Sequence, residues 1–262
     1  LPDGSFITAW TEASDGSETS IAARRFGDDG VPLAGNFTVN SGTAGYQVLP
    51  AISADDDGSF VVTFASYGGD DGNDNGTAGV FARRFGADGA AIGDEFQVNT
   101  YTTGNQTDPD VGVQPSGGFV VVWEDAVQFE RSSIVGRIYD ATGTAAAGEI
   151  VIQSDATYSR ENPQVAIGGD GSFVVTWESA PQDGSSRGMF ARRFSAAGAP
   201  LGDEFQVNSF TPGSQYNASI SDSGLGNVVV AWQSPQDGSA DGVFAQRFIT
   251  SGGPAGSCGD PI

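Results

Sequence analysis

Two glutamates break a repeated sequence pattern at the point where a strand is expected to end. Glu124 and Glu178 each directly follow a Trp, whereas the corresponding positions of the other copies hold Thr11, Ala65 and Gln233. Glycoside hydrolysis needs only two suitably placed carboxyl groups, and carboxylates also accept hydrogen bonds from the hydroxyls of a bound sugar. We therefore take Glu124 and Glu178 as candidate ligand-binding residues.

The composition excludes most other catalytic chemistry. The chain has no His and no Lys, so Ser–His–Asp, Cys–His and Ser–Lys arrangements cannot be assembled. With Cys258 as the only cysteine, zinc sites of the usual His and Cys type are excluded as well. No phosphate-binding Gly-rich loop followed by Lys is present. We assign no catalytic residue and expect no organic cofactor.

One loop has the composition of a calcium site. The segment from Asp70 to Gly76 is longer than its counterparts in the other copies and offers five oxygen-bearing side chains, those of Asp70, Asp71, Asn73, Asp74 and Asn75. Ca²⁺ takes six to eight oxygen ligands from carboxylates, amides and carbonyls. A solvated turn favours the same residue types, and the spacing lacks the Glu that ends an EF-hand loop. The sequence therefore leaves two interpretations open, a Ca²⁺ site and a plain solvated turn.

A recurring glutamine marks the connections between copies. Gln47, Gln106 and Gln215 each stand in a Gly-x-Gln pattern. A side-chain amide that bonds the loop backbone would explain the recurrence. A ligand pocket between neighbouring repeats would use the same residue, so we retain the three glutamines as candidate ligand-binding residues.

The charge restricts the class of partner. The chain carries 33 acidic and 11 basic residues, a net charge of −22. Nucleic acids and anionic lipids both require cationic contacts, so neither is expected as a partner. No apolar run approaches the ~18–20 residues of a membrane span, and we predict no membrane insertion. The single thiol of Cys258 forms no internal disulfide.

These candidates lie within a five-fold repeat. Its aromatic position is occupied by Trp10, Phe64, Trp123, Trp177 and Trp232, at spacings of 54, 59, 54 and 55 residues. A regular period of this length indicates an array of similar supersecondary units. An aromatic residue at a fixed repeat position is usually a core residue, so we interpret these five as packing between units rather than as sugar platforms.

Each copy predicts four short antiparallel strands. In the second copy they cover 50–54, 60–64, 80–85 and 94–99, and an Asp57-Gly58 turn joins the first two. Repeats of about 50 residues with four strands each are typical of β-propeller blades. We predict an all-β fold, a five-bladed β-propeller of four-stranded antiparallel blades, with a linear solenoid as the main alternative.

The whole chain is predicted to form one domain. We place the repeats at about 1–46, 47–105, 106–159, 160–214 and 215–262. The first copy begins at its second strand and the fifth ends after its third. Closure of a ring by these two ends and excision from a longer array both agree with that pattern.

Arginine pairs mark the third strand of the repeat. Arg83 and Arg84 are examples, and Ile138 replaces the second member in the third copy. In so acidic a chain we expect these arginines to pair with acids of the Asp94 and Glu95 type.

The repeat resembles one found in large secreted bacterial proteins. The resemblance is carried by Gly-Ser-Phe-Val-Val-x-Trp, Gly-x-Phe-Ala-Arg-Arg-Phe and Gly-Asp-Glu-Phe-Gln-Val-Asn, which recur along nearly the whole chain. Proteins with such repeats are mostly uncharacterised and are accompanied by calcium-binding or adhesion segments. Cys258-Gly-Asp-Pro261 is similar to the opening of dockerin-like calcium segments. The resemblance implies an extracellular or cell-surface location.

Three functions agree with the sequence. The first is a secreted, non-enzymatic binding or structural module that recognises a glycan or an extracellular protein and is stabilised by Ca²⁺. The second is a carboxylate-based glycoside hydrolase built on a propeller. The third is a structural repeat subunit of a larger extracellular assembly, with self-association or contacts to neighbouring parts of a parent protein.

Overall fold

The structure is a computed structural model of the 262-residue chain, and it describes residues 1–13, 18–68, 77–126, 131–154, 156–223, 227–238 and 241–249. Within these ranges every regular element is a β-strand or an isolated bridge. No helix in them is long and apolar enough to cross a membrane.

Eighteen strands in the described ranges form five antiparallel sheets. The first sheet contains β1 (Phe6–Glu12), β2 (Ser20–Phe26) and β3 (Phe37–Thr38), and the second contains β4 (Tyr46–Ala54), β5 (Phe60–Tyr67), β6 (Ala78–Phe85) and β7 (Phe96–Gln97). The third contains β8 (Asn105–Val113), β9 (Phe119–Ala126), β10 (Ser133–Tyr139) and β11 (Ile150–Val151). The fourth contains β12 (Ser159–Ile167), β13 (Phe173–Ala180), β14 (Gly188–Phe194) and β15 (Phe205–Gln206), and the fifth contains β16 (Tyr216–Asp222), β17 (Asn227–Ser234) and β18 (Gly242–Ile249).

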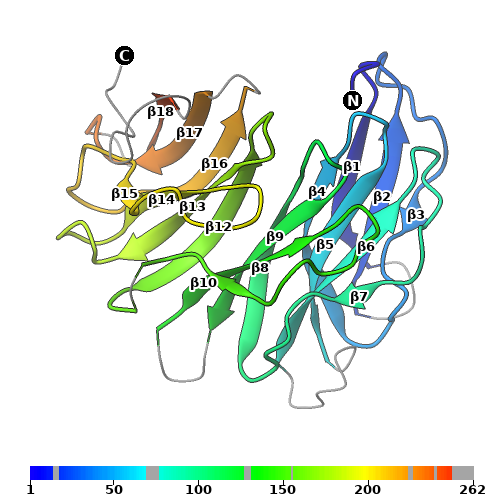
Figure 1. Cartoon of the computed structure of the whole chain (residues 1–262), viewed down its shortest axis with the longest axis horizontal. Helices are drawn as coiled ribbons and strands as arrows, with labels where there is room; N and C mark the ends of the chain where they lie inside the picture. Colours follow the sequence, from blue (N-terminus) through cyan, green and yellow to red (C-terminus); the bar gives the residue numbers. More distant parts are fainter. Residues whose placement is uncertain are drawn as a thin grey trace.

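The sheets are arranged radially as the blades of a five-bladed β-propeller (Figure 1). The first strands of successive blades, β4, β8, β12 and β16, lie next to one another at the centre, and β1 packs on β4. The predicted fold class is confirmed. The first and fifth sheets have three strands each in the described residues, and they stand at the two ends of the fan in Figure 1.

The innermost strands are longer than the sequence predicts. The first strand of the second blade begins at Tyr46 instead of residue 50, so that Gln47 lies within the strand and not in a connection. The reason is a β-bulge between Val48 and Ala51, which interrupts the alternation of side chains and lets pairing with β5 continue beyond it. The fourth strand is shorter than predicted and consists of Phe96–Gln97.

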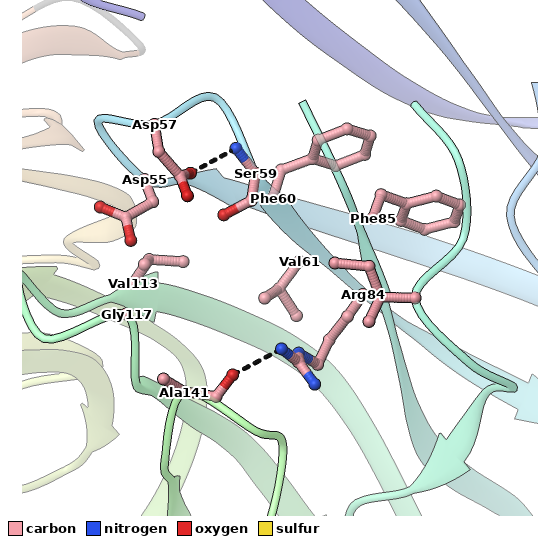
Figure 2. A pocket seen from close by; sticks show the side chains of 11 residues that line it. Asp55, Asp57, Ser59, Phe60, Val61, Arg84, Phe85, Val113, Gly117 and Ala141 are labelled. Atoms are coloured by element: carbon pink, nitrogen blue, oxygen red, sulfur yellow. Dashed lines mark hydrogen bonds between the residues drawn. The ribbon is translucent and has the colours of Figure 1, made fainter. Parts of the chain in front are cut away.

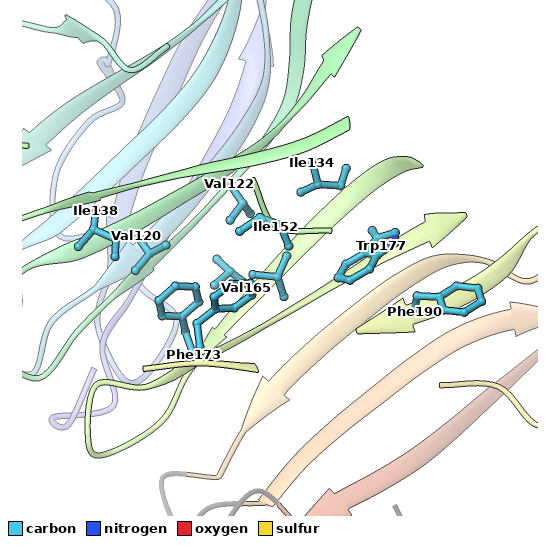
Figure 3. Close-up of a cluster of buried hydrophobic side chains, with 11 residues drawn as sticks. Val120, Val122, Ile134, Ile138, Ile152, Val165, Phe173, Trp177 and Phe190 are labelled. Carbon is cyan, nitrogen blue, oxygen red and sulfur yellow. The ribbon is translucent and has the colours of Figure 1, made fainter. Parts of the chain in front are cut away.

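The core lies between adjacent sheets rather than within a single one. Figure 3 shows the cluster between the third and fourth blades, where Val122 and Ile134 face Trp177 and Phe190. Both faces of β9 and β13 are buried because each blade lies between two others. Four residues of the repeated aromatic position are buried, namely Phe64, Trp123, Trp177 and Trp232, as expected for core packing.

The strand-three arginines connect neighbouring sheets through backbone carbonyls. Arg83 Nη1 donates to the carbonyl of Val39 in the preceding sheet at 2.8 Å, and Arg137 and Arg192 make the same contact with Val98 and Ile152. Glu95 instead accepts hydrogen bonds from two backbone amides of the first blade, at positions 41 and 42. For Arg83, Arg137 and Arg192 the expectation of Arg–acid pairs is therefore corrected, because backbone carbonyls of the preceding sheet accept their hydrogen bonds.

The second arginine of the strand-three pair contacts the following blade, whereas the first contacts the preceding one. Arg84 reaches from the second blade to the carbonyls of Ala141 and Thr142 in the third, beside a small recess of about 210 Å³ (Figure 2). In the third blade Ile138 occupies this position, and a larger recess of about 540 Å³ adjoins it. Gln114 Nε2 compensates in part, because it donates to the carbonyl of Ala196 at 3.0 Å.

Candidate functional site at the centre of the propeller

Each innermost strand carries one residue with a left-handed backbone. These residues are Leu49, Asp108, Asn162 and Asn217, with φ between 51° and 56°. They occupy equivalent positions in the bulges of β4, β8, β12 and β16. Non-Gly residues seldom adopt this conformation, and Asn and Asp tolerate it best. The bulges re-aim the backbone N–H groups at the centre of the propeller, close to the ends of the second strands.

Glu178 is held at this centre by neighbours from two blades. Its Oε1 accepts a 2.9 Å hydrogen bond from Asn162 Nδ2 of its own blade and another of 2.9 Å from the backbone N–H of Asn217 in the fifth. Its Oε2 accepts one of 2.9 Å from Arg187. The side chain is only 2% exposed. Glu178 therefore links the fourth and fifth blades through hydrogen bonds and is not free to bind a ligand directly.

Arg187 joins Glu178 to a second, more accessible carboxylate. Its Nη2 lies 2.8 Å from Oε2 of Glu161, which faces Glu178 directly across the β12–β13 pair. Two carboxylates placed opposite each other repel, and one guanidinium shared between them offsets that repulsion. Arg187 is 39% exposed, so it also faces solvent at this end of the propeller.

Glu124 repeats the arrangement of Glu178 one blade earlier. It accepts a hydrogen bond from the backbone N–H of Asn162 in the next blade and another from the Ser132 hydroxyl. Burial, together with the charges of Asp108 and Glu161, raises the pKa of Glu124 to about 7. At neutral pH this carboxyl is therefore divided between its protonated and ionised forms.

We call Asp108, Glu124, Glu161 and Glu178, together with Arg187, the axial carboxylate cluster. It lies where the innermost strands begin and the second strands end, so it combines residues from the third and fourth blades with a backbone donor from the fifth. Glu124 can donate a proton, Asp108 and Glu161 can accept hydrogen bonds, and Arg187 can donate them. Such a set suits the hydroxyl groups of a sugar.

The structure brings together only part of the predicted site. Glu124 and Glu178 lie in the cluster, whereas Gln47, Gln106 and Gln215 are fully buried and bond the connections between blades. In the sequence, Asp108 and Asn162 could have been found because each precedes a Pro at the same repeat position. Arg187 carries no comparable signal.

The three glutamines hold each connection to its blade. Gln106 Oε1 accepts a hydrogen bond from Asn99 Nδ2 at 3.2 Å, and its Nε2 donates to the carbonyl of Thr103 at 3.3 Å. Gln47 and Gln215 make the equivalent bonds to Asn and to a loop carbonyl. These contacts favour the interpretation in which the amide bonds loop backbone.

The predicted calcium ligands lie outside the described residues. They are Asp70, Asp71, Asn73, Asp74 and Asn75, within the 69–76 range that the structure leaves out. Cys258 also lies outside the described ranges. Among the residues that are described, no group of three or more His, Cys, Asp or Glu side chains has the proximity needed to hold a metal ion.

The sequence matches no protein-family model and no curated protein. Several solved structures share the fold. A protein of unknown function from Dyadobacter fermentans has a TM-score of 0.67 at 12% identity, over 94% of this chain and 76% of that one. The Hadza microbial sialidase Hz136 has a TM-score of 0.58 at 12% identity, over 95% of this chain and 55% of that one. The α-L-arabinanase of Penicillium chrysogenum, solved with arabinobiose, has a TM-score of 0.55 at 9% identity, over 80% of this chain and 64% of that one. Likeness at this level of identity shows the fold alone.

Proposed function

We propose that the axial carboxylate cluster binds a neutral carbohydrate. The observation that carries the proposal is the position of Glu124, which accepts the N–H of Asn162 next to Glu161 and faces Thr107, next to Asp108, across the β8–β9 pair, with its pKa near neutrality. The group offers both donors and acceptors to hydroxyls. Four carboxyl groups and one guanidinium leave the cluster negative, which disfavours sulfated and uronic-acid glycans.

The structural neighbours support a carbohydrate as the ligand class. The Penicillium chrysogenum arabinanase was solved with arabinobiose in place, and the sialidase is named for its action on a carbohydrate. A fold shared with such proteins raises the prior for a glycan without identifying one, because one fold hosts many functions.

Titration calorimetry tests the proposal. The probes are neutral arabinose, xylose, galactose, glucose and mannose oligomers, from disaccharides to hexasaccharides. We expect at least one series to bind and the Glu124→Gln and Glu161→Gln variants to weaken it about tenfold or more, the scale of a lost charged hydrogen bond. Gln206→Ala, at an exposed position of β15, is the control. Absence of binding by every series would overturn the proposal.

Glycoside hydrolysis is a second candidate, favoured by one specific observation. A carboxyl group with a pKa of about 7 beside acids such as Asp108 and Glu161 has the character of a general acid. New reducing ends in the binding mixtures, lost in Glu124→Gln, would support hydrolysis. Binding without new reducing ends would leave the protein a non-enzymatic module.

The location, the Ca²⁺ site and the further partners predicted from the sequence are also part of the proposal. We place the propeller outside the cell or on its surface, with Ca²⁺ at the 70–75 loop and contacts to a parent protein or to further copies. A rise in melting temperature on adding Ca²⁺, absent in an Asp70→Asn and Asp74→Asn variant, tests the calcium site. An unchanged melting temperature would count against it.

A further inference from the structure

A recess of about 500 Å³ lies between the first and second blades at the same end of the propeller as the axial carboxylate cluster. It is lined by Glu18, Gly45, Tyr46, Val48, Tyr67 and Gly68. Tyr46 begins the innermost strand β4 and Tyr67 ends β5, so both stand at the level of the bulges that place the cluster.

The two tyrosines form a pair that no other blade repeats. Tyr46 and Tyr67 are direct cross-strand partners at the end of the β4–β5 ladder. The third and fourth blades place smaller residues in this pair, Asn with Ala126 and Ser with Ala180. The second blade therefore departs from the repeat by adding two aromatic rings. Tyr46 remains 47% exposed, which is unusual for a large aromatic residue that serves only packing.

Two glycines next to the tyrosine pair allow the backbones of β4 and β5 to approach each other closely. Gly45 and Gly68 both have a left-handed backbone, with φ of 68° and 100°. A Cβ on Gly45 would lie 1.9 Å from the carbonyl oxygen of Tyr67, so no other residue fits there. The Tyr46 hydroxyl donates a hydrogen bond to Glu18 from the first blade. The recess thus has aromatic walls and a polar group at one side.

The recess adjoins the cluster through Tyr67. Burial raises the pKa of the Tyr67 hydroxyl, and the charges of Asp108 and Glu124 raise it further. The packing agrees with this, because β4 and β5, which carry the two tyrosines, both contact β8, the strand that carries Asp108. One oligosaccharide can therefore extend from the carboxylates to the tyrosines.

We propose that the Tyr46–Tyr67 recess is an aromatic subsite that stacks one ring of a neutral oligosaccharide whose other end lies on the axial carboxylate cluster. This inference rests on the proposed function and specifies the ligand as longer than one sugar unit. Tyrosine offers a broad apolar face with a polar tip, which matches the C–H face and the hydroxyl rim of a sugar ring. The carboxylates and the tyrosines would then bind different units of one chain.

The other blades provide variants that suit the fold. Tyr46→Ser and Tyr67→Ala install residues found at the equivalent positions of the fourth blade, Ser159 and Ala180. Each is compared with the matching Tyr→Phe variant, which keeps the ring and loses only the hydroxyl. The probes are the disaccharide and hexasaccharide of each neutral series named above, measured by titration calorimetry.

We expect Tyr67→Ala to weaken hexasaccharide binding about tenfold, the size of one lost stacking contact, with disaccharide binding unchanged and Tyr67→Phe close to the parent protein. Loss of hexasaccharide binding in Glu124→Gln but not in Tyr46→Ser or Tyr67→Ala would overturn the subsite and leave the proposed function standing. Failure of every probe to bind the parent protein would overturn both. Equal weakening of disaccharide and hexasaccharide in the tyrosine variants would also contradict a separate subsite.

Discussion

The backbone N–H of Asn217 donates a 2.9 Å hydrogen bond to Oε1 of Glu178 and so joins the fifth blade to the fourth at the propeller centre. The backbone N–H of Asn162 makes the same contact with Glu124 one blade earlier. In both cases a left-handed residue on an innermost strand meets the glutamate that follows a repeated Trp. The two acids that break the repeat therefore share one structural role, and they differ in accessibility.

Removal of the Glu178 carboxylate should destabilise the protein. Glu178→Ala leaves Asn162 Nδ2, Arg187 Nη1 and the Asn217 N–H without the acceptor they share, and we expect a loss of about 2–4 kcal/mol in the free energy of unfolding. Urea denaturation followed by tryptophan fluorescence measures it. Glu178→Gln keeps one acceptor oxygen and should lose less. If Glu178→Ala changes the free energy of unfolding by less than about 0.5 kcal/mol, the usual range of surface substitutions, the hydrogen bonds of Glu178 do not stabilise the propeller.

Stability should fall as the pH rises from weakly acidic to neutral. Burial raises the pKa of Glu124 from 4.5 to about 7 and that of Asp110 from 3.8 to about 6. Between the unfolded and the folded pKa of each group the folded protein retains a proton that the unfolded chain has lost. The free energy of unfolding therefore decreases with pH across that window and levels off above it.

Two isosteric variants isolate this pH effect. Asp110→Asn keeps an acceptor for the backbone N–H of Val165, which now bonds Asp110 Oδ2 at 2.7 Å. Glu124→Gln likewise keeps an acceptor at the cluster. Each should flatten the slope of unfolding free energy between about pH 4 and pH 7. A slope unchanged in both variants would mean that other acids dominate it.

Loss of a connecting glutamine should affect stability and not ligand binding. Gln106→Ala removes a buried side chain that bonds Asn99 Nδ2, the carbonyl of Thr103 and Asp125 Oδ1, and we expect a cost of about 1–3 kcal/mol. Thermal unfolding compared with the exposed Gln206→Ala measures this cost. Weakened glycan binding in Gln106→Ala at unchanged melting temperature would instead restore the ligand-binding interpretation.

At the interface between the third and fourth blades, an added arginine should offset the stability lost with Gln114. Gln114 Nε2 donates to the carbonyls of Gly171 and Ala196, so Gln114→Ala should lose about 1–2 kcal/mol of unfolding free energy. Ile138→Arg in that background places an arginine where Arg84 spans the previous interface. We expect it to recover part of the loss, as measured by urea denaturation. A further loss in the double variant would mean that the recess beside Ile138 cannot take the longer side chain.

The strand order of a blade could be predicted from the sequence because the same pattern recurs in each copy. The apolar run after each turn and the fixed spacing of Phe85 and Phe96 predict strands whatever the neighbours are. The innermost strands were predicted too short because a bulge hides the alternation on either side of it. Gln47 therefore appeared to lie in a connection.

The site was harder to predict because it combines different blades. Glu124 and Glu178 could be found as departures from the repeat. Glu161, beside Arg160, also departs from the repeat, whereas Arg187 has no signal in the sequence, and only the register between β12, β13 and the start of β14 brings the two together. The Tyr46–Tyr67 pair depends on the register of β4 and β5, which no single strand reveals.

Hydrogen exchange with and without the oligosaccharide that binds most tightly in calorimetry tests the central claim most directly. A ligand on the axial carboxylate cluster should slow exchange of the backbone amides at 107–108, 124–126 and 161–162, where the bulges and strand ends meet. The turns at the opposite end of the blades, 86–90, 116–118 and 140–144, should exchange as before. Protection confined to those turns, with none at the bulges, would contradict a carbohydrate site at the centre of the propeller.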